Sequence, residues 1–319
     1  MLLSLFLLII GLLLLIKGGD WLVNGSSSIA RKYSISELVI GLTIVAFGTS
    51  APELVVSSLA AINHHPEIAL GNVIGSNNFN LFVILGITGI ITPLAVQKTT
   101  IRIEIPISLF AAFILLLLAN NFFANDTLII SRLDASLLLI CFVSFILYIS
   151  KTIKKEPHIV SSITNEASQK TIRSVVLILL GLAGLMLGGK WVVDSSVDIA
   201  RYFNISEKVI GLTIVAMGTS LPELFTSIIA IRKNSTDIAI GNVIGSNIFN
   251  IFLILGVGGM IRPMEYSVAF NSDLILLIIG SILLLLAMFT GRKRKLDRWE
   301  AIILLSIYIA YIVYVGIRN

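Results

Sequence analysis

The segment Ile35–Ala60 reads ISELVIGLTIVAFGTSAPELVVSSLA, and the segment Ile205–Ala230 reads ISEKVIGLTIVAMGTSLPELFTSIIA. A second matched pair follows them, with ALGNVIGSNNFNLFVILG over Ala69–Gly86 and AIGNVIGSNIFNIFLILG over Ala239–Gly256. The same offset of 170 residues, without a gap, separates the members of both pairs. Self-similarity of this length identifies an internal duplication, so the chain is treated as two copies of one unit.

The composition is that of a chain dissolved in lipid. Apolar residues make up 56% of the 319 residues and charged residues 13%, against roughly 45–50% and 25% in soluble domains. Apolar runs of about 18 residues or more recur, and such runs cross a hydrocarbon core of about 30 Å as helices. The single cysteine, Cys141, excludes an internal disulfide. The sequence therefore predicts an all-α integral membrane protein whose basic residues reflect membrane topology, with no nucleic-acid partner.

Each half of the duplication is interpreted as five membrane spans. The predicted spans are 2–25, 35–63, 67–92, 101–120 and 128–150 in the first half, and 173–196, 205–232, 237–261, 271–290 and 297–316 in the second. The predicted domains are a first five-helix repeat (1–150), a cytoplasmic linker (151–172) and a second, inverted five-helix repeat (173–319). Ser34-x-x-Glu37 and Asn204-x-x-Glu207 match the capping-box pattern and predict where the second helix of each half starts.

The loop charges predict the orientation of these spans. With the N-terminus outside, sixteen Lys and Arg residues fall on the inner side and five on the outer side. Cytoplasmic loops carry an excess of positive charge, so we expect both termini outside a cell membrane. Five spans per half make the two copies face opposite ways, giving ten transmembrane helices as two inverted repeats. Inverted repeats are typical of transporters that bind cargo near the midplane, although some channels share them.

The first chemical motif is GTSAPE at Gly48–Glu53, which recurs as GTSLPE at Gly218–Glu223. Pro52 lacks an N–H and crowds the carbonyl four residues back, so the helix is predicted to break near Gly48. Freed carbonyls at membrane depth need polar partners, and the hydroxyls of Thr49 and Ser50 add further oxygens. A carboxylate at this depth, here Glu53, is a functional hypothesis by default, with a structural buried glutamate as the alternative.

The second motif is GNxxGSNxxN, which starts at Gly71 and recurs from Gly241. Its residues Asn72, Ser76 and Asn80 are four apart and therefore line one helix face. The alternative function of the amides at Asn72 and Asn77, and of their copies, is to join helices through interhelical hydrogen bonds.

Together the two motifs offer carboxylate, amide, hydroxyl and carbonyl oxygens, without Cys and without His inside a predicted span. Ca²⁺ accepts six to eight oxygens in flexible geometry, whereas Mg²⁺ loses its water reluctantly. Zn²⁺ would favour His or Cys. Two carboxylates neutralise one divalent ion, so Ca²⁺ is the simplest cargo. We expect no cofactor and no obligate protein partner, only transported ions and membrane lipid.

At these motifs the chain resembles the sodium/calcium exchanger branch of the cation/calcium exchanger superfamily, in its prokaryotic form. The matching residues cover about half the chain. The resemblance implies the following ion ligands: side chains of Thr49, Ser50, Glu53, Ser76, Asn80, Thr219, Ser220, Glu223, Ser246 and Asn250, and backbone carbonyls at Ala46 and Ala216. Some members carry Asp where Asn250 stands, which predicts one acid fewer and altered ion preference here.

The resemblance implies a secondary active antiporter that extrudes Ca²⁺ as Na⁺ enters. A Ca²⁺/H⁺ exchanger or a K⁺-dependent Na⁺/Ca²⁺ exchanger could use the same site. From another class, a gated cation channel would also need oxygen ligands, although Pro-broken helices in an inverted repeat favour a closed central site. An enzyme is not expected, because no His in a predicted span can activate Ser50 or Ser220.

Overall fold

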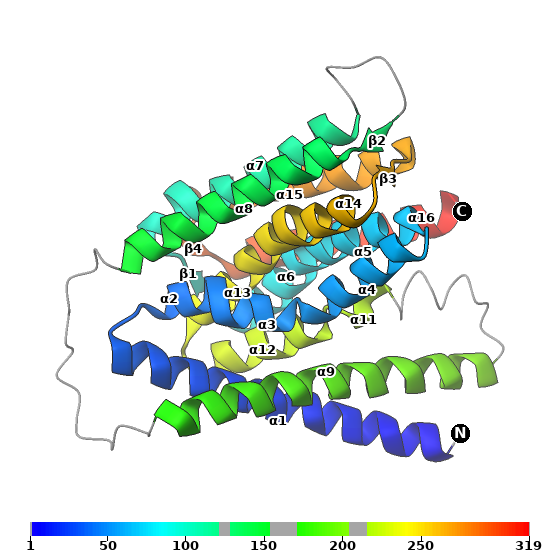
Figure 1. Ribbon diagram of the computed structural model, residues 1–319. Helices are drawn as coiled ribbons and strands as arrows, with labels where there is room; N and C mark the ends of the chain where they lie inside the picture. The colour runs from blue at the N-terminus through cyan, green and yellow to red at the C-terminus, as the bar shows by residue number, and fades with distance from the viewer. Residues whose placement is uncertain (1, 121–127, 154–170, 204–215, 319) are drawn as a thin grey trace. The chain divides into compact units, whose positions relative to one another are not determined.

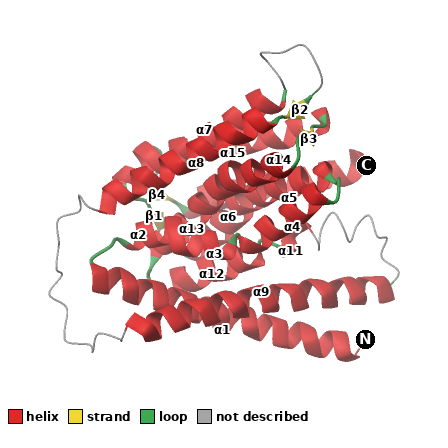
Figure 2. Ribbon diagram, in the orientation of Figure 1, coloured by secondary structure: helices red, strands yellow, loops and turns green. Residues whose placement is uncertain are grey.

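The computed structural model describes residues 2–120, 128–153, 171–203 and 216–318. These residues are helical except for turns and four two-residue strands (Figure 2). Seven helices are long and apolar enough to span a membrane, and an eighth span results if the bent pair Glu37–Thr49 and Ala51–Ile62 is counted as one. The described chain is therefore a mostly membrane-spanning helical protein. It divides into two compact units, 1–49 with 145–242 and 50–144 with 243–319, which we call unit 1 and unit 2.

Unit 1 contains the long antiparallel helices α1 (Leu2–Tyr33) and α9 (Thr171–Tyr202), which lie side by side (Figure 1). Small residues of the two helices meet along their seam. A methyl group added to Gly18 would fall 2.8 Å from the Gly181 carbonyl oxygen, and one added to Gly11 would fall 2.9 Å from that of Gly188. Both contacts are closer than real Cβ atoms allow, so the seam requires glycine.

The first and sixth predicted helices were too short. They were expected to end near 25 and 196, whereas α1 ends at Tyr33 and α9 at Tyr202. Gly25 resembles a helix stop in the sequence. In the structure it lies inside α1, where an added methyl group would be 2.7 Å from the Ser174 carbonyl oxygen. This glycine therefore permits close helix packing instead of ending the helix.

Unit 1 contains the first part of the predicted second span. That part comprises α2 (Glu37–Ile40), the π-helical turn η1 (Gly41–Val45) and α3 (Ala46–Thr49). The cap of α2 is Ser36, whose hydroxyl accepts from the Val39 N–H at 3.3 Å, so the prediction that Ser34 starts this helix was wrong. Ser34 has a φ of 51° and instead forms part of the turn after α1. The predicted cap at Asn204 and Glu207, and residues 154–170 of the predicted linker, lie outside the described residues.

Unit 1 also contains α11 (Ala216–Gly218), α12 (Leu221–Arg232) and residues 236–242 of α13 (Thr236–Ile248). Of these, α11 and α12 both contact α9, and α12 also contacts α1. The chain passes from unit 1 to unit 2 between Thr49 and Ser50, returns to unit 1 inside α8 (Arg132–Ile153), and enters unit 2 again inside α13.

Unit 2 is built on two helices that include π-helical segments. The first runs through α5 (Pro66–Asn78), η2 (Phe79–Ile84) and α6 (Leu85–Ile91). The second runs from the end of α13 through η5 (Phe249–Leu255) and α14 (Gly256–Ile261). As candidate spans they are 78% and 94% buried, against 22–39% for the other five, so they are the most shielded helices. The motif GNxxGSNxxN lies on both.

Around these helices unit 2 contains α4 (Ala51–Ile62), η3 (Thr100–Glu104), α7 (Ile105–Ala119), most of α8, η6 (Val268–Phe270), α15 (Asn271–Ala287) and α16 (Arg298–Arg318). Its strands form two antiparallel pairs, β1 (Leu94–Ala95) with β4 (Lys295–Leu296) and β2 (Ile129–Ile130) with β3 (Met264–Glu265). Each pair joins one loop of the first half of the sequence to one of the second half.

Candidate functional site

The first GTSxPE motif forms the predicted break. Helix α3 ends at Thr49, α4 begins at Ala51, and the two segments are bent by 46°. Pro52 occupies the first turn of α4, where a missing N–H costs nothing. Gly48 allows the chain to pass α9, because a methyl group there would overlap the Leu182 side chain.

The second GTSxPE motif has the same local structure. Helix α11 ends at Gly218, and α12 begins at Leu221 with Pro222 in its first turn. A methyl group on Gly218 would overlap the Val193 side chain of α9. Both breaks therefore place a fully buried glutamate, Glu53 or Glu223, in the first turn of the helix that follows. A helix N-terminus carries partial positive charge, which favours a carboxylate there.

In each half, an asparagine side chain is hydrogen-bonded to the helix that follows the break. In unit 2 the Asn72 amide donates to the Ser57 hydroxyl at 3.0 Å and to the Glu53 carbonyl at 3.4 Å. In unit 1 the Asn242 amide donates to the Ser227 hydroxyl at 3.1 Å and to the carbonyl of Glu223 at 3.3 Å. The two copies agree to about 0.1 Å. Asn72 and Asn242 therefore do join helices, as the alternative interpretation held, and the helices they join carry the glutamates.

Unit 2 contains six of the expected site residues. These are Ser50, Glu53, Ser76, Asn80, Ser246 and Asn250, all of them buried. The Ser76 hydroxyl donates to Glu53 Oε1 at 3.4 Å. The amide oxygens of Asn80 and Asn250 are buried without a hydrogen-bond donor. Such oxygens are costly to bury, and a cation would satisfy them.

The amide nitrogens of these two asparagines are held by residues that were not expected in the ligand set. Asn80 donates to Asn247 Oδ1 at 3.1 Å, and Asn250 donates to Asn77 Oδ1 at 2.9 Å. Asn80 and Asn250 lie at the second position of η2 and η5, and π-helical turns often occur at functional sites. The sequence signals for this arrangement were the repeat of Asn77 at position 247 and the expected alternative that these amides join helices.

Unit 1 contains the other six expected residues, namely Ala46, Thr49, Ala216, Thr219, Ser220 and Glu223. Ala46, Thr49, Ser220 and Glu223 are buried, and Thr219 is half-buried. The Thr49 hydroxyl lies 3.0 Å from Asn242 Oδ1 and 3.1 Å from the Val45 carbonyl oxygen. Thr49 is thus adjacent to the amide that holds the Glu223 helix, although the two residues come from different halves of the sequence.

The chemistry of these groups suits a hard cation. Carboxylate, amide and hydroxyl oxygens are the ligands of Ca²⁺, whereas Zn²⁺ favours His and Cys. Within the described residues no three His, Cys, Asp or Glu side chains form a group that could hold a metal. The described oxygens near each buried glutamate belong to amides and hydroxyls, and the fold is that of a multi-pass membrane protein.

Comparison with known proteins identifies the family. The model of the sodium/calcium exchanger protein family matches residues 3–151 and 173–316. The sodium/calcium exchanger MaX1 of Methanosarcina acetivorans is 34% identical over 343 residues, covering 96% of this chain and 97% of that protein. The inner membrane protein YrbG of Escherichia coli is 38% identical over 291 residues, covering 89% and 88%.

Solved structures agree with the sequence comparison. The sodium-calcium exchanger NCX_Mj, soaked with 2.5 mM Na⁺ and 0.1 mM Ca²⁺, is similar with a TM-score of 0.80 and 38% identity over 98% of both chains. The chain belongs to the sodium/calcium exchanger family, which is a family of membrane transporters.

Proposed function

We propose that the protein is a secondary active antiporter that extrudes Ca²⁺ from the cell while Na⁺ enters down its gradient. The observation that carries this proposal is the buried oxygen set of unit 2, in which the amide oxygens of Asn80 and Asn250 lie without a donor on the most shielded helices. The family of the chain and its similarity to NCX_Mj give the same cargo. The transported ions are substrates, and the proposal requires no cofactor, protein partner or catalytic residue.

The proposed ion site draws on both halves of the sequence. Its ligands are the side chains of Thr49, Ser50, Glu53, Ser76, Asn80, Thr219, Ser220, Glu223, Ser246 and Asn250, with the carbonyls of Ala46 and Ala216. Glu53 and Glu223 supply the two negative charges that match one Ca²⁺ or more than one Na⁺. Their equal burial and their identical position after a Pro-broken helix support equal roles.

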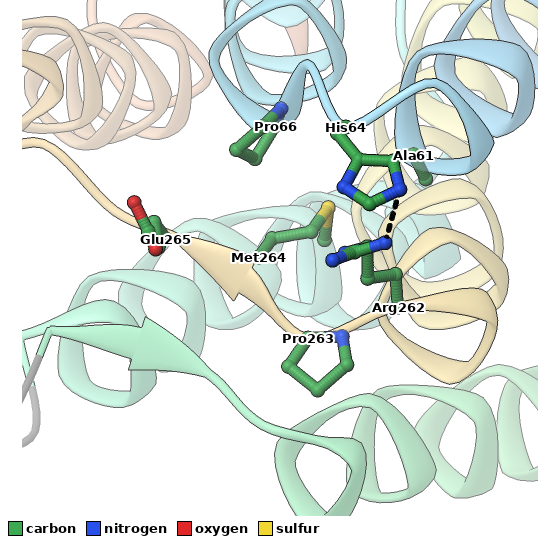
Figure 3. A pocket seen from close by; sticks show the side chains of 7 residues that line it. All are labelled: Ala61, His64, Pro66, Arg262, Pro263, Met264 and Glu265. Carbon is green, nitrogen blue, oxygen red and sulfur yellow. Dashed lines mark hydrogen bonds between the residues drawn. The ribbon is translucent and has the colours of Figure 1, made fainter.

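The proposed architecture is ten transmembrane helices in two inverted five-helix repeats, 1–150 and 173–319, joined by a cytoplasmic linker at 151–172. Contacts inside unit 2 support the alternation of loops. Strand β1 pairs with β4, and both lie in loops that the charge pattern assigns to the inside. Strand β2, at the outer start of the predicted fifth span, pairs with β3, and His64 faces Arg262 (Figure 3). The loops that contain β3, His64 and Arg262 are all assigned to the outside.

The proposed location is the cell membrane, with both termini outside. Reporter proteins that are active on only one side of the membrane, fused after residue 318 and within 151–172, test this topology. We expect an outside signal from the first fusion and an inside signal from the second. A cytoplasmic C-terminus would contradict both the ten-span count and the inverted repeat.

Transport itself is tested with purified protein in liposomes loaded with Na⁺. Uptake of ⁴⁵Ca²⁺ is expected when the outside is free of Na⁺ and to stop when the Na⁺ gradient is collapsed. Imposing K⁺ and H⁺ gradients one at a time then distinguishes the K⁺-dependent and H⁺-coupled alternatives. Uptake that persists without any opposing cation gradient would indicate a channel and would contradict the proposed function.

A further inference from the structure

Four buried asparagines of unit 2 form a hydrogen-bonded network, in which Asn77 and Asn247 bond each other reciprocally and Asn80 and Asn250 are attached at its two ends. Asn80 donates to Asn247 Oδ1 at 3.1 Å, and Asn250 donates to Asn77 Oδ1 at 2.9 Å. The amide of Asn77 in turn donates to the Asn247 carbonyl at 3.3 Å, and the amide of Asn247 donates to the Asn77 carbonyl at 3.4 Å. Every bond of this network joins the first half of the sequence to the second.

Two backbone carbonyls fix the direction of every amide in this network. A carbonyl can only accept, so Asn77 and Asn247 must each direct their nitrogen toward the backbone of the other. Their oxygens then lie on the opposite side, where they accept from Asn250 and Asn80. The nitrogens of those two amides are thereby directed toward Asn77 and Asn247, and their oxygens are left buried without a donor. Reversing any one of the four would place two acceptors or two donors against each other.

We propose that Asn77 and Asn247 are positioning residues that hold the ion-ligating oxygens of Asn250 and Asn80 toward the transported cation. This inference rests on the proposed function, because it takes Asn80 and Asn250 as ligands. Each ligand is oriented by an asparagine of the opposite half. Asn77 and Asn247 therefore couple the two halves at the ion site without themselves touching the ion.

The fixed orientation of the Asn80 and Asn250 amides affects ion binding. An unconstrained carboxamide presents either its oxygen or its N–H₂ group, and the latter carries positive partial charge that repels a cation. Fixing the oxygen outward removes the unproductive orientation before the ion arrives. Partners that orient a metal ligand in this way typically change metal affinity by about 10–100-fold when they are removed.

The first test replaces each positioning residue in the full-length protein and measures Na⁺-driven ⁴⁵Ca²⁺ uptake. Asn77→Ala and Asn247→Ala are expected to raise the KM for Ca²⁺ by about 10–100-fold. The matched control is Asn78→Ile, which removes a neighbouring buried amide that donates to the Asp273 carbonyl at 3.0 Å. Isoleucine stands at the equivalent position 248. We expect this control to leave the KM within about twofold, and an equal effect of all three changes would overturn the proposal.

The second test distinguishes positioning from general stabilisation by double-mutant cycles. If Asn77 acts through Asn250, adding Asn77→Ala to Asn250→Ala should change the Ca²⁺ KM little further. The same holds for Asn247 with Asn80. Additive effects in both of these pairs, or non-additivity confined to pairs within one half, would overturn the proposal. Thermal unfolding of each purified variant checks folding, with Asn77→Ser and Asn247→Ser used where an alanine variant does not fold.

Failure of the proposed function is recognised separately. Absence of Na⁺-driven uptake by the unaltered protein would overturn antiport. The cycles would then be measured as equilibrium Ca²⁺ binding by calorimetry, which requires no transport. Crossed non-additivity in binding would still support the positioning role of Asn77 and Asn247. A protein that does not bind Ca²⁺ would overturn both proposals.

Discussion

The two halves of the chain are nearly identical around the glutamates and different at their margins. Each half has a Pro-broken helix, a buried glutamate in the turn that follows, and an asparagine bonded to that glutamate's carbonyl at 3.3–3.4 Å. Each half also supplies one member of each crossed amide pair. The comparison shows that the groups proposed to meet the ion have been kept in duplicate.

Outside this centre the copies have diverged. Asn78, which bonds the carbonyl of Asp273, is replaced in the second half by the apolar Ile248. Asp20 of α1 forms an ion pair with Lys233, which directly follows α12. In the repeat, the position equivalent to Asp20 is Lys190, and the position equivalent to Lys233 is Asn63. The same pair of charges is therefore not encoded twice. The predictions below test whether the duplicated groups are equivalent and whether the diverged ones matter less.

The largest effect is expected from the glutamates. Glu53→Gln and Glu223→Gln should each abolish Ca²⁺ uptake in the liposome assay, because each removes one of the two buried charges proposed to balance a divalent ion. Loss of one partner of a buried charge pair costs about 3–5 kcal/mol, which corresponds to an affinity loss of about a hundredfold to several thousandfold. Equal losses would confirm that the halves are equivalent, whereas near-normal uptake by either variant would show that its glutamate is structural.

Glu300→Gln is the matched control for this experiment. Glu300 is also buried, but its carboxylate accepts from the Thr290 hydroxyl and from the Asp297 N–H at 2.8 Å, which together cap α16. We expect this variant to lose some stability and to keep the KM for Ca²⁺. A loss of uptake equal to that of Glu53→Gln would mean that burial of the glutamate, and not ion binding, explains the effect.

A smaller and again equal effect is expected from the asparagines that hold the broken helices. Asn72→Ala and Asn242→Ala each remove two hydrogen bonds, one to a serine and one to the glutamate carbonyl. We expect each to raise the Ca²⁺ KM by about tenfold, the lower end of the range for residues that orient a metal ligand. Ser57→Ala and Ser227→Ala remove only one of the two bonds and should have smaller effects. A variant at one position that is silent while its copy is damaging would break the equivalence of the halves.

Much of the fold was predictable because the repeat and the apolar runs are long. The described α-helices overlap the predicted spans, and the breaks occur within two residues of Gly48 and Gly218, since proline geometry is local. The length of α1 was not predictable, because glycine disfavours a helix in isolation and only the contact of Gly25 with Ser174 shows its role. The prediction of Ser34 as a cap failed for a similar reason, since its positive φ depends on the preceding turn.

For the candidate site, the residue types were predictable and their pairing was not. Spacing along one helix indicated that Asn72, Ser76 and Asn80 share a face. It could not indicate that Asn80 is oriented by Asn247, because that bond joins positions 167 residues apart. Helix periodicity also assumes a regular α-helix, and the π-helical turns that begin at Phe79 and Phe249 change the spacing at the point where Asn80 and Asn250 lie.

The smallest effect is expected from the ion pair that only one pair of positions encodes. The Lys233 ammonium contacts the Asp20 carboxylate, donates to Asn24 Oδ1 at 2.6 Å, and so joins α1 to the end of α12. The Asp20 side chain is 39% exposed, so solvent screens the attraction, and exposed pairs of this kind contribute about 1 kcal/mol at most. Asp20→Asn and Lys233→Gln should therefore lower the thermal unfolding midpoint only slightly at low salt and leave it unchanged at high salt, where the pair is screened in any case. The Ca²⁺ KM of both variants should stay within about twofold of the unaltered protein. A loss of uptake comparable to that of Asn72→Ala would show that this diverged contact is part of the transport machinery, and the division between a duplicated centre and a tolerant margin would then be wrong.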